Sequence, residues 1–153
     1  MSQPVIFVVH DEPATLESVA TALERRFGAD YRIVTDADPD SALVRLGDAC
    51  QRGAPVALVL AGVSSLGASG LDWLGRVRAL CPWTSRCALM SYGDEAIHGA
   101  LRRALAQGQL DTFLLTPVGD PEQRLYPVVA EILGAWARTV RPGPPVVTIV
   151  GER

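Results

Sequence analysis

The chain has 153 residues, enough for one domain with a substantial buried core. Hydrophobic residues make up 48% of it and charged residues 20%, which is typical of a globular domain and excludes a disordered chain. The formal net charge is -3, so we expect no basic face of the kind that binds nucleic acid. Every basic residue is an arginine, and the chain contains no lysine.

Short apolar runs rich in β-branched residues alternate with segments whose apolar residues recur at helical spacing. The runs predict strands at residues 5–9, 31–35, 56–60, 86–90 and 111–115, and the intervening segments predict helices near 13–27, 42–52, 71–80, 96–105 and 121–136. This alternation predicts an α/β fold, a doubly wound five-stranded parallel sheet covered by helices on both faces. A functional site is then expected at the carboxyl ends of the strands.

The end of the chain has a different composition. Residues 141–145 form a proline-rich spacer, and the apolar run 146–150 resembles one more strand. We therefore expect a domain over residues 1–138, followed at 139–153 by a linker and the first strand of a further domain.

The cysteines and the N-terminus argue for an ordinary cytoplasmic protein. Cys50, Cys81 and Cys87 have no metal-type spacing and are odd in number, so we expect three reduced thiols, with Cys87 in a core strand. No signal peptide is recognisable, and no apolar stretch approaches the length of a membrane span. Trp73, Trp83 and Trp136 are expected in the core or partly covered at the surface.

The loop after the third predicted strand consists of tiny residues, Gly62-Val63-Ser64-Ser65-Leu66-Gly67-Ala68-Ser69. Its glycine spacing approaches that of a phosphate-binding loop, but Ala68 stands where that motif needs a lysine. No GxGxxG dinucleotide motif is present either. The loop therefore predicts a close-packed turn rather than a nucleotide site, and no cofactor is expected.

The strand ends together resemble the receiver domains of two-component response regulators. The resemblance covers residues 4–138 and rests on Val9-His10-Asp11-Glu12-Pro13 and Leu114-Leu115-Thr116-Pro117 together with the order of elements. It implies the flavodoxin-like (βα)5 receiver fold. It also implies a pocket in which an acidic pair and an acceptor aspartate hold Mg²⁺, while a hydroxyl residue and a lysine contact the phosphoryl group.

Carried onto this chain, the resemblance implies a degenerate phosphorylation pocket. His10 stands in place of the first acid and Asp11 in place of the second; Gly62 replaces the acceptor, Met90 the hydroxyl residue and Thr116 the lysine. Phe113 occupies the family's switch-aromatic position and is expected to be a static packing residue.

Two histidines could suggest further chemistry. Adjacent residues at a strand end rarely converge on one ion, so for Asp11 and Glu12 beside His10 we expect helix capping and solvent contact rather than a metal site. His98 has no evident serine or cysteine partner and is expected at the surface.

A closer resemblance is carried by the ends of the chain. Residues 4–9, the segment Asp120-Pro121-Glu122-Gln123-Arg124-Leu125-Tyr126-Pro127-Val128-Val129 and the tail 145–151 resemble bacterial fusion proteins in which a receiver precedes a thioredoxin-reductase-like flavoprotein. The resemblance implies a flavoprotein-type partner following this chain. Residues 1–153 themselves carry nothing that would bind FAD.

The sequence thus predicts a non-enzymatic, phosphorylation-independent receiver-like module that regulates or dimerises an attached flavoprotein. The resemblance implies a self-dimer through residues 94–138, with Ala100, Ala104, Leu110 and Tyr126 as contacts. Two alternatives stay open: a true phosphorelay receiver with a displaced acceptor such as Asp36 or a loop serine, and a small-ligand sensor that uses the vacated pocket.

Overall fold

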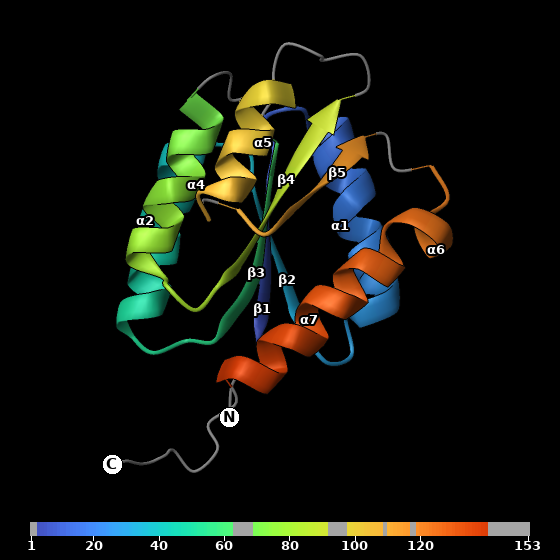
Figure 1. The fold of residues 1–153 in the computed structure, drawn as a ribbon. Helices are drawn as coiled ribbons and strands as arrows, with labels where there is room; N and C mark the ends of the chain where they lie inside the picture. Colours follow the sequence, from blue (N-terminus) through green and yellow to red (C-terminus); the bar gives the residue numbers. More distant parts are fainter. Residues whose placement is uncertain (1–2, 63–68, 92–97, 109, 117–118, 141–153) are drawn as a thin grey trace.

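The computed structural model describes residues 3–62, 69–91, 98–108, 110–116 and 119–140. Its strands are β1 (Val5–Val9), β2 (Arg32–Asp36), β3 (Val56–Gly62), β4 (Ser85–Ser91) and β5 (Thr112–Thr116). They form one sheet in the order β2-β1-β3-β4-β5, and every neighbouring pair is parallel (Figure 1). The predicted α/β fold with a doubly wound five-stranded sheet is confirmed.

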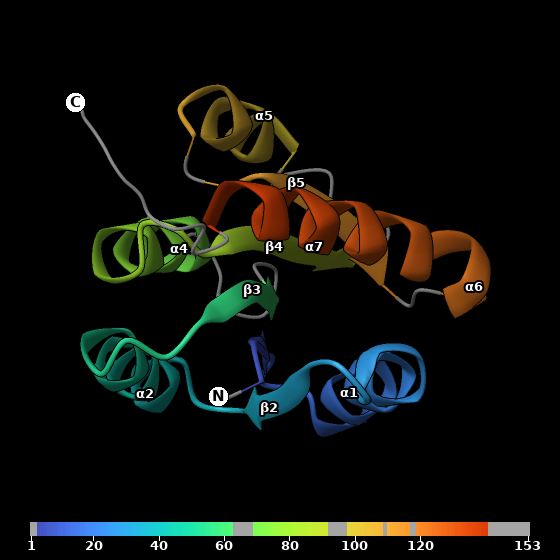
Figure 2. The same cartoon turned by 90° about the horizontal axis from the view of Figure 1, so that it is seen from below.

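Helices cover both faces of this sheet. They are α1 (Pro13–Phe27), α2 (Pro39–Gln51), α4 (Ser69–Leu80), α5 (His98–Ala106), α6 (Pro121–Arg124) and α7 (Tyr126–Val140). Figure 2 shows α1 and α7 on one side of the sheet and α2 and α4 on the other. None of the helices in the described ranges is both long and apolar enough to cross a membrane.

The two central strands explain why the sequence adopts this arrangement. Every residue of β1 and β3 is buried, and successive side chains point to opposite faces of the sheet. Phe7 and Val59 thus pack against α2, α4 and α5, whereas Ile6 and Leu58 pack against α1 and α7. A strand buried on both faces needs a continuous apolar sequence, as Val5–Val9 and Val56–Ala61 provide.

The last helix departs from the prediction. One continuous helix was expected from Pro121 past Trp136, but the chain breaks it into α6 and α7 at Leu125. Pro127 has no backbone N–H to donate to the preceding turn, and its ring disfavours helical geometry just before it. The second part ends at Val140, so the domain boundary expected at residue 138 falls within α7.

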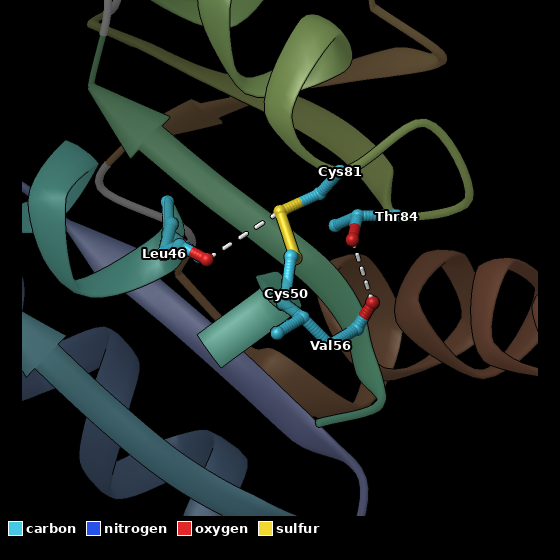
Figure 3. The surroundings of a disulfide bond; sticks show 5 residues. All are labelled: Leu46, Cys50, Val56, Cys81 and Thr84. Atoms are coloured by element: carbon cyan, nitrogen blue, oxygen red, sulfur yellow. Dashed lines mark hydrogen bonds between the residues drawn. A yellow bond between two sulfur atoms is a disulfide. The ribbon is translucent and has the colours of Figure 1, made fainter. Parts of the chain in front are cut away.

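The prediction of three reduced thiols is wrong for two of the cysteines. Cys50 at the end of α2 and Cys81 just after α4 form a disulfide, with their α carbons 5.9 Å apart (Figure 3). The sheet order places α2 and α4 side by side, which brings together cysteines 31 residues apart in the chain. Cys87 is free and buried in β4, as expected.

The tryptophans are only partly as predicted. Trp73 is buried, and its indole N–H donates to the carbonyl of Pro39 at 2.8 Å. Trp136 is half-buried on α7. Trp83 lies at the surface in the turn after α4 and is 70% exposed, so it has less cover than expected.

The disulfide predicts a specific pattern of thiol alkylation. We expect iodoacetamide to leave the native protein unlabelled, because Cys87 is buried and desolvation raises the pKa of its thiol. Unfolding without reductant should expose one reactive thiol, and unfolding after reduction should expose three, as counted by intact mass. More than one labelled thiol in the unreduced, unfolded protein would contradict the disulfide.

Reduction should also lower the free energy of unfolding by about 3 kcal/mol, because the crosslink closes a loop of intermediate length in the unfolded chain. Urea unfolding with and without reductant measures this difference. A Cys50→Ser/Cys81→Ser variant is the control, since reductant should leave its stability unchanged.

Candidate functional site

The carboxyl ends of the strands bring the predicted pocket residues to one edge of the sheet. In the parallel pairing of β1 with β3, Val9 lies opposite Ala61, so the next residues, His10 and Gly62, come side by side. Gly62 in turn pairs with Leu89, next to Met90, and Ser91 pairs with Thr116 at the end of β5. The side chain of Thr116 lies outside the described part of the structure.

His10 fills the space beside Gly62. Its residue is only 5% exposed, although histidine is polar and stands at a strand end. A Cβ placed on Gly62 would overlap Cδ2 of the imidazole and lie 2.8 Å from its Nε2 and 3.1 Å from its Cγ. Any side chain at position 62, an aspartate included, therefore requires the ring of His10 to move.

Hydrogen bonds hold this ring and the backbone around it. The backbone N–H of Glu12 donates to Nδ1 of His10 at 3.0 Å, and the N–H of His10 donates to the carbonyl of Asp36 at 3.2 Å. Because Nδ1 accepts a hydrogen bond, the neutral ring carries its hydrogen on Nε2, the nitrogen that lies over Gly62. The imidazole thus directs its Nε2–H towards the end of β3.

The two acids after His10 are exposed. Oδ1 of Asp11 lies 3.7 Å from Nδ1 of His10, but its side chain is 53% exposed. Glu12 is the N-cap residue of α1, and its carboxylate accepts a hydrogen bond from the hydroxyl of Thr15 instead of from the backbone. Within the described ranges, no three histidine, cysteine or acidic side chains lie close enough together to hold a metal ion.

Met90 lies near the end of β4, at the same edge of the sheet. It is 1% exposed and belongs to the core cluster under α2, α4 and α5. Phe113 of β5, which was expected to be a static packing residue, pairs with Ala88 of β4, is 36% exposed and lies outside both core clusters.

Asp36, at the end of β2, is the strand-end carboxylate with the most partners. Its Oδ2 lies 3.0 Å from Nη1 of Arg45, and its Oδ1 accepts from the backbone N–H of Asp38 at 2.9 Å. Desolvation alone would raise the pKa of Asp36, but the hydrogen bonds from Asp38, Arg45 and Ser41 outweigh it and lower the pKa below 3.8. The Arg45 guanidinium also lies 5.2 Å from the ring centroid of Phe7, which fixes its position.

Sequence reasoning named His10 and Gly62 but missed how they fit together, and it missed the partner of Asp36. The strand register could have revealed the fit of His10 to Gly62. The two residues follow the paired residues Val9 and Ala61, and a glycine there leaves space for a neighbouring ring. The other expected features, namely the loop 63–68 with its serines and the side chain of His98, lie outside the described part of the structure.

No protein-family model matches the chain. No curated protein matches it either. Solved structures do resemble it. An uncharacterised protein from Neptuniibacter caesariensis superimposes with a TM-score of 0.73 and 23% identity, over 95% of this chain and 97% of that one. A CheY-like response regulator receiver domain from Methanospirillum hungatei JF-1 superimposes with a TM-score of 0.72 and 19% identity, over 90% and 98%.

The same fold is found within a larger protein. NtrX from Brucella abortus, solved in complex with ADP, matches 97% of this chain with a TM-score of 0.72 and 19% identity, although the match covers only 31% of NtrX. Identities this low establish the architecture and leave the chemistry to the residues themselves. The chain has the flavodoxin-like fold of response regulator receivers.

Proposed function

We propose that this chain is a receiver-like regulatory module that works without phosphorylation. The observation that carries the proposal is the position of the His10 ring, which takes up the space that any acceptor side chain at position 62 would need. The strand order and the similarity to a solved receiver domain support a regulatory role.

The remaining groups at this edge are also poorly suited to phosphoryl transfer. Mg²⁺ needs several oxygen ligands to offset its dehydration, and Asp11 supplies one outward-facing carboxylate. The chain has no lysine to pair with a phosphoryl group, and Met90 supplies no hydroxyl. In this proposal the module performs no catalysis and acts through its surfaces in the cytoplasm.

A displaced acceptor is the principal rival, and Asp36 is its described candidate. The contacts with Arg45 and with the N–H of Asp38 lower the pKa of this carboxylate, which makes it a weaker nucleophile towards a phosphoryl donor. In-line transfer also needs a metal ion and an acceptor in one fixed geometry. The small-ligand alternative meets the obstacle that His10 already fills the space beside Gly62.

The partner of the module stays a prediction from resemblance. We propose that a thioredoxin-reductase-like flavoprotein follows residues 1–138 and that 139–153 lead into it. We also propose the self-dimer through residues 94–138, but two of its four named contacts, Ala104 and Leu110, are buried in the core and could not take part in it. Tyr126 donates its hydroxyl hydrogen to the carbonyl of Ala22, and the side chain of Ala100 lies outside the described part.

The proposal predicts that acetyl phosphate leaves the protein unmodified. With Mg²⁺ present, intact mass spectrometry at neutral pH should show no phosphoryl adduct, whereas a receiver that retains its acceptor aspartate should show one in parallel. A single adduct that disappears in Asp36→Asn or Asp11→Asn would overturn the proposal in favour of a displaced acceptor.

The fit between His10 and Gly62 predicts a strong coupling between the two positions. Gly62→Ala should destabilise the fold by about 1–3 kcal/mol, because the new Cβ overlaps the imidazole. In a His10→Ala background the same change should cost less than about 0.5 kcal/mol, since the obstacle is gone. Chemical unfolding of the four proteins measures the cycle.

Gly75→Ala is the matched control for that experiment. A Cβ on Gly75 meets nothing within 4 Å, and alanine favours a helix by up to about 1 kcal/mol over glycine. Stability should therefore be kept or gained. Equal costs of Gly62→Ala in both backgrounds would show that the ring does not occupy this space.

The contacts of Asp36 predict a pH dependence. Because its pKa is lowered in the folded state, the ionised carboxylate contributes stability that is present above pH 3.8 and is lost as the pH falls through the folded value. Asp36→Asn should therefore be less stable than the wild type at pH 7, and the gap should shrink at pH 2. Urea unfolding at both pH values tests this, and a gap that does not shrink would contradict it.

A further inference from the structure

The exposed apolar side chains are concentrated on the α2–α4 side of the molecule. Among the described residues, the exposed large hydrophobic ones are Val44 at 66%, Leu80 at 41%, Trp83 at 70% and Phe113 at 36%. Val44 lies on α2, Leu80 ends α4, and Trp83 lies in the following turn, whereas Phe113 lies on β5. We call Val44, Gly47, Leu80 and Trp83 the Trp83 surface.

Two contacts show that α2 and α4 lie side by side along this surface, with their beginnings together and their ends together. Near their beginnings, Trp73 of α4 donates to the carbonyl of Pro39 of α2. Near their ends, a Cβ on Gly47 would lie 3.6 Å from Cδ1 of Leu80. Val44 is one helical turn before Gly47, so the apolar surface extends from α2 across this contact towards the turn with Trp83.

The turn that carries Trp83 is fixed from both sides. On one side, Cys81 is joined to Cys50 by the disulfide, and on the other the hydroxyl of Thr84 donates to the carbonyl of Val56 at 2.8 Å (Figure 3). The N–H of Thr84 also donates to the carbonyl of Cys81 at 3.1 Å. A tryptophan on so rigid a turn loses little backbone entropy when a partner covers it.

The exposed charges on α2 and α4 would attract those of a second copy of the chain whose helices run antiparallel to these. Exposed acids stand in the first turns of the two helices, Asp40 on α2 and Asp72 on α4. Exposed arginines stand later, Arg76 on α4 and Arg52 just after α2, while Asp48 lies four residues before Arg52, a spacing at which the two attract.

A two-fold axis beside Gly47 and Leu80 would bring apolar and oppositely charged groups of the two copies together. It would place Leu80 against its symmetry mate, Asp40 of one copy near Arg52 of the other, and Arg76 near the exposed indole of Trp83, a favourable partner for a guanidinium. Each attractive contact would then occur twice.

We propose that the Trp83 surface binds a second copy of this chain, with α2 and α4 of the two copies antiparallel. The interface lies on a different part of the fold from residues 94–138 and does not depend on phosphorylation.

The concentration dependence of sedimentation tests the proposal. We expect the wild type to dimerise and Trp83→Ala to raise the dissociation constant at least about 30-fold, as for a central tryptophan in an interface. Phe113→Ala, which removes the exposed aromatic ring outside the Trp83 surface, should leave the constant unchanged. Thermal unfolding should show that both variants fold, because neither side chain belongs to a core cluster.

Charge exchange tests the antiparallel arrangement. Asp40→Arg and Arg52→Asp should each weaken dimerisation about fivefold, since each disrupts two exposed ion pairs per dimer. The double variant should regain the wild-type constant, which a general effect on folding would not produce. A monomeric wild type at 0.5 mM, a dimer that Phe113→Ala disrupts, or a double variant weaker than either single one would overturn the proposal.

Discussion

The central strands β1 and β3 have every residue buried, and this double burial governs much of the molecule. Side chains on both faces must be apolar, so helices are needed on both sides to cover them. Backbone groups inside such a sheet have no access to water, so they must pair with neighbouring strands in one fixed register. That register brings His10 and Gly62 side by side where the strands leave the core.

At this edge of the sheet, His10 and Gly62 have complementary shapes. A glycine at the end of β3 leaves room for a ring, and the imidazole of His10 takes that room with its Nδ1 satisfied by the N–H of Glu12. The two residues support one another, because neither a larger residue at position 62 nor an unsatisfied ring at position 10 would be stable there.

Covalent and hydrogen bonds hold the C-terminal ends of α2 and α4, which lie away from this edge. A disulfide joins the helices, and a threonine hydroxyl ties the following turn to the start of β3. These crosslinks hold in place a turn whose indole is 70% exposed. At the edge of the sheet near Gly62, the His10 ring fills the available space. The Trp83 surface, in contrast, has exposed apolar side chains.

The sequence by itself determined the strands, the order of elements and the fold, because a buried parallel strand must be a continuous apolar run and a covering helix must have an apolar stripe. It also indicated which residues would meet at one edge of the sheet, since these stand at the ends of parallel strands. The break before α7 could have been read from Pro127, whose missing N–H acts locally. The Cys50–Cys81 bond, the burial of Ala104 and Leu110, the exposure of Trp83 and the overlap of His10 with position 62 were decided only in the tertiary structure. Each depends on the distance between segments far apart in the chain, and that distance is set by strand order, register and the offset between packed helices.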